Sequence, residues 1–314
     1  MPVGRDNPGS SLSVCIGIFV FCCAPVNPLQ AADSVPVSRV LELVSSMEAS
    51  WAKVNDYTMA IEKTERLIDG SVKYERGTIK FRKPDQHYLR VDEGVNKGSE
   101  IIYPMPGGKN LAIAHPGGFT GSMIRIMTRT PLVRGLVPTI FSIRDPKIIK
   151  GQHHTVADSN LGSVIRLISS NLRTAARYAE GSVQLYSDAS LDGRSVYKIQ
   201  ITLPRNVGTR HVVRRGNNLW TIAQKYNQNR YVILYHNANV LSSVDPGSGQ
   251  VIFIPRYYAS RGDIWVSKQS LLPVKLEIYD SDGNLYESYV YSSIEINPGL
   301  TDLDFDPWNP AYRF

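Results

Sequence analysis

Alternation of apolar and polar residues runs through most of this chain and predicts β-strands. Tyr57–Ile68 alternates in this way, and Asp69-Gly70 is a typical hairpin turn before the return strand Ser71–Arg82. Similar short runs with turn residues between them predict a large antiparallel sheet. They are Tyr88–Asp92, Ser99–Tyr103, Leu111–His115, Ser182–Asp188, Arg194–Leu203, Arg261–Lys268, Pro273–Asp280 and Asn284–Ile296.

Two other segments have the period of amphipathic helices, Val35–Ala52 and Leu161–Ala179. Ile124–Ile149 contains several prolines and unevenly spaced apolar residues, which predicts loop with short helical turns. Strands and helices together predict an α+β fold. The apolar faces consist of Val40, Leu43, Val44, Met47 and Trp51 in the first helix and Leu161, Val164, Ile165, Ile168, Leu172 and Ala176 in the second.

The stretch His211–Pro255 has a different order, a strand, two short helices and a strand. A β-rich run is followed by a turn, in which Asn217 or Asn218 can cap the first helix. The second helix fits Tyr231–Asn237, and the second strand fits Val251–Ile254. A unit of this size has a very small core, so most of its apolar residues are structural.

Several residues of this stretch occur at a recognisable spacing: Val213, Gly216, Leu219, Trp220, Ile222, Ala223, Tyr226, Asn237, Gly249, Gln250, Ile252, Ile254 and Pro255. With these residues the stretch resembles a LysM module. That family binds N-acetylglucosamine chains, so the resemblance implies a βααβ domain at 211–255 with peptidoglycan as its partner.

In the LysM family the sugar lies in a shallow groove between the loop before the first helix and the loop after the second. The resemblance therefore implies that backbone N–H and C=O groups and small apolar faces of these loops contact the glycan. The implied glycan-binding residues are Gly216, Asn217, Asn218, Leu219, Ala238, Asn239, Val240 and Leu241.

The chain departs from the LysM pattern in two loops near this groove. The family usually has Asp-Thr where this chain has Asn217-Asn218, and the segment Asp245–Gln250 differs in length or sequence from the usual Pro-Gly-Gln. The alternative interpretation is a degenerate module that serves as a spacer or docking piece.

The N-terminus has the features of a secretory signal peptide. Arg5 precedes an apolar run from Leu12 to Val26, and the small residues Ala31-Ala32 follow it. The run of about fifteen residues is shorter than the roughly twenty needed to span a bilayer. We therefore expect residues 1–32 to be removed on export to the periplasm, with an uncleaved membrane anchor as the alternative.

All three cysteines lie inside this segment, so its cleavage would exclude disulfides and cysteine catalysis in the mature protein. Lipoprotein signals have a small residue before the acylated cysteine. Phe21 precedes Cys22, and Cys22 precedes Cys23, which disfavours lipidation.

The rest of the chain contains several short motifs: Phe81–Pro84, Tyr88–Val91, Leu272–Asp280, Asp282-Gly283, Tyr289–Tyr291, Ile296–Asp302 and Asp304–Pro307. With these motifs the chain resembles an exported bacterial family of unknown function, which belongs to the superfamily of lipoprotein carriers such as LolA and LppX. The resemblance covers Val40–Pro204 and Gly262–Phe314. It implies a curved antiparallel half-barrel wrapped over helices, with an apolar hollow that holds a lipid or acyl chain in relatives.

The strands before and after the LysM-like stretch belong to one pattern, which predicts a discontinuous host domain at 40–204 and 262–314. The insertion would interrupt a hairpin-like connection between Ile199–Leu203 and Asp263–Val266, with Arg205–Arg210 and Arg256–Ser260 as linkers. Insertions are tolerated where a host loop is exposed and the guest termini lie close together.

Few residues indicate catalysis or metal binding. The sequence has no GxSxG, HExxH, P-loop or dinucleotide-binding motif, so we expect a non-catalytic protein without a cofactor. His153-His154 would point to opposite faces of a strand, which disfavours a shared metal. Asp302, Asp304 and Asp306 could face one side and bind calcium, but a solvated turn with Phe305 packed inward explains them better. We therefore expect no metal site.

Composition adds little to the function. The chain has 314 residues, 42% of them hydrophobic, and a net charge of +7 that can favour anionic wall polymers or lipid headgroups. Nucleic acid is not expected as a partner, and the oligomeric state stays open.

Three hypotheses of function remain. The first is a periplasmic protein that binds peptidoglycan and holds a lipid or lipoprotein acyl chain. The second is a wall-anchored structural or interaction protein without a lipid, and the third, least favoured, is a cell-wall enzyme.

Overall fold

A computed structural model describes residues 33–115, 117, 139–241 and 245–314. The predicted signal segment 1–32, its cysteines, and most of the region predicted as loop around Ile124–Ile149 lie outside the described residues. Among the described residues, no helix is both long and apolar enough to cross a membrane.

Strands dominate the described chain, as the alternating pattern predicts. They are β1 (Asp33–Val35), β2 (Asp56–Arg66), β3 (Val72–Arg82), β4 (Gln86–Gly94), β5 (Glu100–Tyr103), β6 (Leu111–His115), β7 (Thr139–Ser142), β8 (Ser182–Leu191), β9 (Arg194–Thr202), β10 (Gly208–Val212), β11 (Val251–Pro255), β12 (Arg261–Ser267), β13 (Pro273–Tyr279) and β14 (Leu285–Ile296). The helices are α1 (Val37–Ala52), α3 (Pro146–Lys150), α4 (Leu161–Tyr178), α5 (Leu219–Tyr226) and α6 (Arg230–His236), with short 3₁₀ turns η2 (Val156–Asp158) and η3 (Asp302–Phe305).

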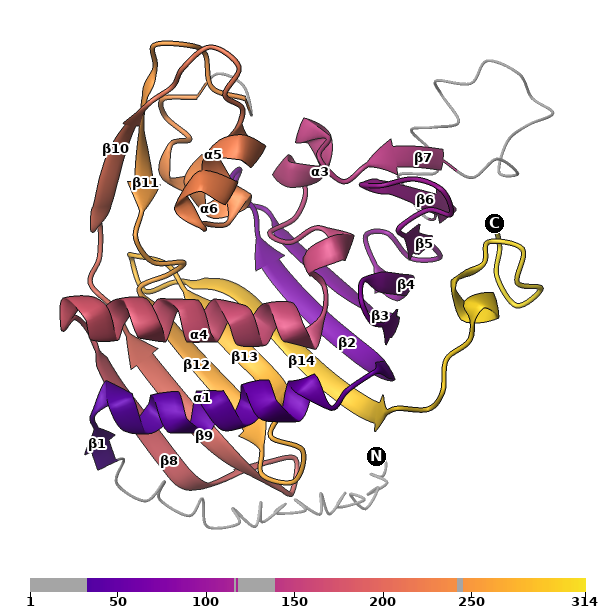
Figure 1. Cartoon of the computed structure of the whole chain (residues 1–314), viewed down its shortest axis with the longest axis horizontal. Coiled ribbons are helices and arrows are strands. Elements are labelled where there is room, and N and C mark those ends of the chain that lie inside the picture. Colours follow the sequence, from indigo (N-terminus) through magenta and orange to yellow (C-terminus); the bar gives the residue numbers. More distant parts are fainter. Residues whose placement is uncertain (1–32, 116, 118–138, 242–244) are drawn as a thin grey trace, which may run out of the picture.

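Twelve of the described strands form one antiparallel sheet. Their order is β1-β8-β9-β12-β13-β14-β2-β3-β4-β5-β6-β7. The C-terminal strand β14 therefore lies beside β2 in the middle of the sheet and joins its two halves. The sheet is bent, and α1 and α4 lie side by side across one of its faces (Figure 1). This open, curved sheet over helices agrees with the predicted half-barrel.

The main core lies where these two helices pack on the sheet. Asn160 caps α4, since its side chain accepts a hydrogen bond from the Ser163 N–H at 2.9 Å. Gly162 permits close packing on α1, because an added Cβ would lie 2.4 Å from the Trp51 ring. The buried residues of α4 include Leu161, Ile165, Ile168 and Leu172, as predicted; the prediction of Ala176 was wrong, because Ala175 is buried in its place and Ala176 is exposed.

The stretch with the LysM-like pattern folds as strand, helix, helix and strand, the order that its sequence predicts. Among the strands that the structure describes, β10 and β11 pair only with each other, in a separate two-stranded sheet. Asn218, rather than Asn217, caps α5 in a reciprocal arrangement with Thr221. We call residues 208–255 the inserted unit. Its small core contains Val213, Leu219, Ile222, Ala223, Ile233, Leu234, Ile252 and Ile254.

β9 and β12 are hydrogen-bonded neighbours on either side of the inserted unit, with Ile199 opposite Ile264. The unit also packs on the main sheet through α6. Tyr231 and Val232 of α6 belong to one apolar cluster with Ile278 and Tyr286. The unit is therefore fixed against the sheet by side chains as well as by its two connections.

The sequence pattern missed two short strands, β1 and β7. β1 has three residues and pairs with β8, and β7 has four residues and pairs with β6. Runs of this length do not show a period of two clearly enough to be predicted. The edges of the sheet were therefore less predictable than its centre.

The C-terminal carboxylates have separate partners, as in the solvated turn that we favoured. Lys80 pairs with Asp304 at 2.7 Å, Arg82 pairs with Asp302, and Asp306 accepts a hydrogen bond from the backbone N–H of a neighbouring residue. Phe305 is buried, as predicted.

Candidate functional site

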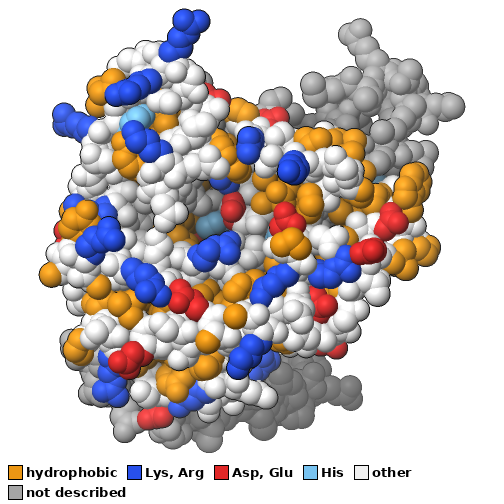
Figure 2. Space-filling view, in the orientation of Figure 1, with side chains coloured by type: hydrophobic (Ala, Val, Ile, Leu, Met, Phe, Trp, Pro, Cys, Tyr) orange, Lys and Arg blue, Asp and Glu red, His pale blue; other side chains and the backbone are white. Residues whose placement is uncertain are grey.

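A cavity of about 750 Å³ lies between α4 and the sheet. Strands β2, β3, β4, β9, β12, β13 and β14 contribute to it from one side and α4 from the other. The inserted unit forms part of its wall with residues of α5, the α5–α6 connection and the start of α6. In the space-filling view the surface is hollowed between the inserted unit and α4 (Figure 2).

One side of the cavity is aliphatic. The alternation of each strand places every second side chain on the face that α4 covers, and these side chains are mostly branched and apolar. The residues that form this apolar half are Met59, Ile61, Ile79, Leu89, Val91, Val164, Leu167, Ile168, Ile201, Leu203, Ile264, Leu276 and Ile278.

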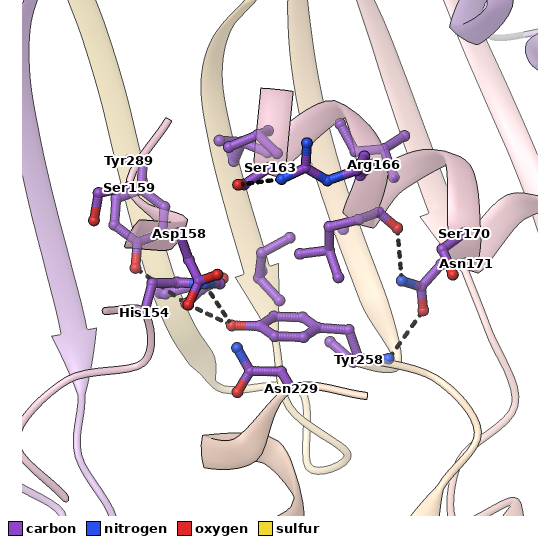
Figure 3. Close-up of a pocket in the computed structure, with 18 of the residues that line it drawn as sticks. His154, Asp158, Ser159, Ser163, Arg166, Ser170, Asn171, Asn229, Tyr258 and Tyr289 are labelled. Atoms are coloured by element: carbon purple, nitrogen blue, oxygen red, sulfur yellow. Dashed lines mark hydrogen bonds and ion pairs between the residues drawn. The ribbon is translucent and has the colours of Figure 1, made fainter. Parts of the chain in front are cut away.

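The other side of the cavity is polar and centres on Tyr258, which follows β11. Its hydroxyl donates a hydrogen bond to Glu287 Oε2 at 2.9 Å and lies 3.0 Å from His154 Nε2. Its backbone N–H donates to the Asn171 side chain of α4 at 2.9 Å (Figure 3). Tyr258 therefore connects the inserted unit's C-terminal linker, α4 and β14.

Glu287 is buried in this polar end and is surrounded by donors. His153 Nδ1 lies 2.7 Å and His154 Nε2 3.4 Å from its Oε2 atom. Burial alone would raise the pKa of Glu287. The charge of His154 and the hydrogen bonds from both histidines outweigh burial and hold that pKa well below its usual range.

The interaction with Glu287 shifts the pKa of His154 upward, whereas the pKa of Glu287 is lowered. Burial alone would lower the pKa of His154, but the carboxylate of Glu287 raises it above the usual value. At the polar end, pairing between Glu287 and His154 thus favours the charged form of both side chains beside the apolar half of the cavity.

A second cluster of charged side chains, on β2 and β3, lies next to this pair. Lys63 Nζ is 2.8 Å from Glu75 Oε2 and 3.9 Å from Glu65 Oε2, and Lys73 Nζ is 3.3 Å from Glu75 Oε1. Burial and the charge of Lys63 lower the pKa of Lys73, whereas Glu65 and Glu75 outweigh burial and raise the pKa of Lys63. Glu75 is thus paired with both lysines at short distance, whereas the Lys63 ammonium is farther from Glu65.

Basic side chains occur along the border of the cavity, several of them around the hollow in Figure 2. Arg173 pairs with Glu48 at 3.0 Å, and Arg230 of α6 pairs with Asp158 at 2.9 Å. Arg166 of α4 donates to the Ser163 hydroxyl at 2.7 Å. A polar or anionic group at the cavity border would meet these cations.

The glycan-binding residues predicted from sequence lie elsewhere, on two loops of the inserted unit. In the first loop, Gly216 and Asn218 are exposed, Asn217 is half-buried and accepts a hydrogen bond from Arg214 N–H at 3.0 Å, and Leu219 is fully buried. The Leu219 side chain therefore belongs to the core.

In the second loop, Ala238, Asn239 and Val240 are exposed, and Leu241 packs against the same core cluster as Leu219. The backbone N–H groups of Val240 and Leu241 both donate to Asn237 O at 2.9 Å. The two predicted loops thus share one small core.

Sequence reasoning missed the polar end of the cavity. His153 and His154 lie in a loop before η2, not on a strand, so the argument from opposite strand faces does not apply to them. Glu65, His154, Tyr258 and Glu287 come from distant parts of the chain, and no local motif joins them. An alternating strand that carries an acid at an inward position, such as Glu65 in β2, was the only available signal.

Comparison with known proteins places this fold in a family. A model of the family DUF1571, described as a protein of unknown function, matches residues 54–215 and 254–314. The chain belongs to this family. The match leaves out residues 216–253, which make up most of the inserted unit. No curated protein matches the chain.

Solved structures similar to the chain match most of its length at low sequence identity. A DUF1329 family protein from Desulfovibrio piger is 14% identical with a TM-score of 0.35, covering 86% of this chain and 97% of that chain. A LolA superfamily protein from Nitrosomonas europaea is 11% identical with a TM-score of 0.28, covering 87% and 98%. Lipoprotein LppX from Mycobacterium tuberculosis is 9% identical with a TM-score of 0.35, covering 84% and 98%. LolA and LppX are also the two carriers named in the resemblance that the sequence motifs indicate.

Proposed function

We propose that this protein is an exported, non-catalytic binding protein that holds the acyl chain of a lipid or lipoprotein in the cavity under α4. The observation that supports it is the cavity itself. Its volume of about 750 Å³ falls within the roughly 300–1,000 Å³ that is usual for ligand pockets. Each methylene group buried there would contribute about 0.8 kcal/mol.

The division of the cavity into two sides supports an amphiphilic ligand. The aliphatic side chains under α4 would surround the chain, and the tyrosine, histidine and arginine side chains at the other side would face its polar head. The ion pairs of the polar end neutralise one another, which favours binding over catalysis.

Variants that fill the cavity test this proposal. Leu89 on β4 and Val164 on α4 are half-buried and line the apolar half. Leu89→Trp and Val164→Trp should weaken uptake of a fluorescent fatty acid, cis-parinaric acid, by about tenfold or more, equivalent to about 1.4 kcal/mol. Val72→Trp is the control, because Val72 is 63% exposed on β3 outside the cavity.

Circular dichroism of all three variants would establish that they fold. Equal uptake by the three variants, or no uptake by the unaltered protein, would contradict the acyl-chain proposal. The second outcome would favour a wall-anchored interaction protein without a lipid.

We also propose that the inserted unit is a LysM module that binds the N-acetylglucosamine chains of peptidoglycan. The motif spacing in the sequence supports this, together with the strand-helix-helix-strand order. The proposed site comprises the exposed loops that contain Gly216–Asn218 and Ala238–Val240. The protein would thereby be held at the cell wall in the periplasm.

A matched pair of surface variants tests glycan binding. Val240 is 53% exposed in the proposed groove, and Val212 is 57% exposed on β10. Insoluble peptidoglycan should retain the unaltered protein and Val212→Glu but release Val240→Glu, because a charged side chain would occupy the groove. If the unaltered protein stays in solution, or if both variants are retained alike, the LysM proposal is wrong.

A further inference from the structure

Three buried side chains converge where β2, β14 and the loop before η2 meet. Glu65, His153 and Glu287 are 1%, 2% and 2% exposed. One oxygen or nitrogen atom of each lies within 4.8 Å of the corresponding atoms of the other two. The chain is thus folded so that an imidazole and two carboxylates, distant in sequence, meet in a dry environment.

One of these carboxylates is incompletely satisfied. Glu65 Oε1 accepts a hydrogen bond from the Tyr289 hydroxyl at 2.6 Å. Glu65 Oε2 is buried and has no hydrogen-bond partner among the described residues, and the ammonium group of Lys63 is 3.9 Å from it. A buried carboxylate oxygen without a donor is costly, and a cation coordinated there would remove that cost.

The surroundings of His153 orient its ring as a metal ligand. Its Nε2 atom lies 3.0 Å from the carbonyl oxygen of Arg66, which can only accept, so Nε2 carries a hydrogen. Its Nδ1 atom faces Glu287 Oε2 at 2.7 Å, and a metal ion bound there would replace the proton that these two atoms share. A ligating histidine whose other nitrogen donates to a backbone carbonyl is the usual outer-shell arrangement of metal sites.

We propose that Glu65, His153 and Glu287 bind a divalent first-row metal ion, with zinc as the best fit. An imidazole nitrogen and carboxylate oxygens suit zinc, whereas magnesium and calcium prefer a full set of oxygen ligands. His154 Nε2 lies 3.4 Å from Glu287 Oε2, beside the three proposed ligands but outside their cluster. The hydrogen bond from Tyr258 to Glu287 would orient that carboxylate in the outer shell.

Such an ion would connect three separate parts of the fold. Glu65 and Glu287 come from neighbouring strands, and the ring of His153 lies 4.3 Å from the ring of Tyr231 in α6. The ion would therefore stabilise the loop against which the inserted unit packs. It would also lie at the polar end of the cavity, which Glu65 and Glu287 line.

The test is zinc binding by the full chain after chelator treatment and desalting. We expect the unaltered protein to retain an equimolar amount of zinc in elemental analysis and to unfold at a higher temperature with zinc than without it. Glu65→Gln and His153→Gln should weaken binding by more than about tenfold, since even the loss of an outer-shell partner has such an effect. His87→Gln is the matched control, because His87 is equally buried but lies outside this cluster.

Two results would overturn the proposal. One is the absence of tight zinc binding by the unaltered protein, and the other is equal binding by His153→Gln and His87→Gln. Should Glu65→Gln or His153→Gln fail to fold, cobalt substitution of the unaltered protein decides the question. Visible absorption bands of a four- or five-coordinate ion with nitrogen and oxygen ligands support the site, and the spectrum of hexaaquo cobalt contradicts it.

Discussion

At the scale of single residues, His87 shows how burial in the fold changes the pKa of a side chain. Its Nδ1 atom donates to the carbonyl oxygen of Asp85 at 2.7 Å, and its Nε2 atom lies 3.3 Å from the Asn160 amide nitrogen, which donates to it. The ring packs edge-on against Phe81 at 4.9 Å. Burial lowers the pKa of His87 to about 4, so the neutral ring is the stable form in the folded protein.

This histidine predicts loss of stability in mild acid. Between pH 6.5 and about 4 the unfolded chain binds a proton at this site and the folded chain does not, so stability falls as the pH falls through that range. The effect should reach about 3 kcal/mol at the acidic end. Urea unfolding across this pH range should show a weaker dependence for His87→Gln than for the unaltered protein, and parallel curves would refute the assignment.

The residue scale is also where sequence reasoning was weakest. Tyr286, Tyr289 and Tyr291 of β14 are all buried in the sheet. The hydroxyl of Tyr289, however, also donates to Glu65 at 2.6 Å. Such partners meet only after strands β2 and β14 pair, and pairing between distant strands leaves no local pattern in the sequence.

At the scale of elements, the pairing of β9 with β12 indicates that the host sheet can close without the inserted unit. Thr202 lies opposite Arg261, and the Leu203 N–H donates to Ser260 O at 2.7 Å. The two strand ends are therefore already adjacent where the unit leaves and rejoins the sheet. This geometry supports the proposed division into a discontinuous host domain and a guest.

Excision of the unit tests that division. Replacing residues 206–256 with a two-residue Asn-Gly turn should give a folded protein that keeps the strand signal of the twelve-stranded sheet in circular dichroism. Its free energy of unfolding should fall by several kcal/mol, because Ile278 and Tyr286 lose their contacts with Tyr231 and Val232 and a fully buried apolar side chain contributes about 1.5–3 kcal/mol. An unfolded or aggregated product would contradict the division.

Helices and strands were predictable where the periodic pattern of apolar residues extended over enough residues. The helix predicted at Val35–Ala52 is α1 at Val37–Ala52, and the strand predicted at Tyr57–Ile68 is β2 at Asp56–Arg66. The cavity was not predictable at this scale, because alternation separates two faces of a strand without indicating which face is concave. The curvature of the sheet decides that, and it depends on all strands together.

At the scale of the whole molecule, the inserted unit and the sheet form one cavity wall. Gln228 and Asn229 of the unit line the cavity together with residues of α4. If both proposals hold, the part that binds peptidoglycan also helps to enclose the lipid. The protein would then hold an amphiphilic ligand at a fixed place in the cell envelope.

The most direct test of the central claim is native mass spectrometry of the full chain, exported to a bacterial periplasm and purified without detergent. We expect adducts in the mass range of a phospholipid or lipopeptide, which organic extraction removes and which Leu89→Trp and Val164→Trp reduce. A mass without adducts for the unaltered protein, together with no uptake of added fatty acid, would contradict the claim that the cavity under α4 holds an acyl chain.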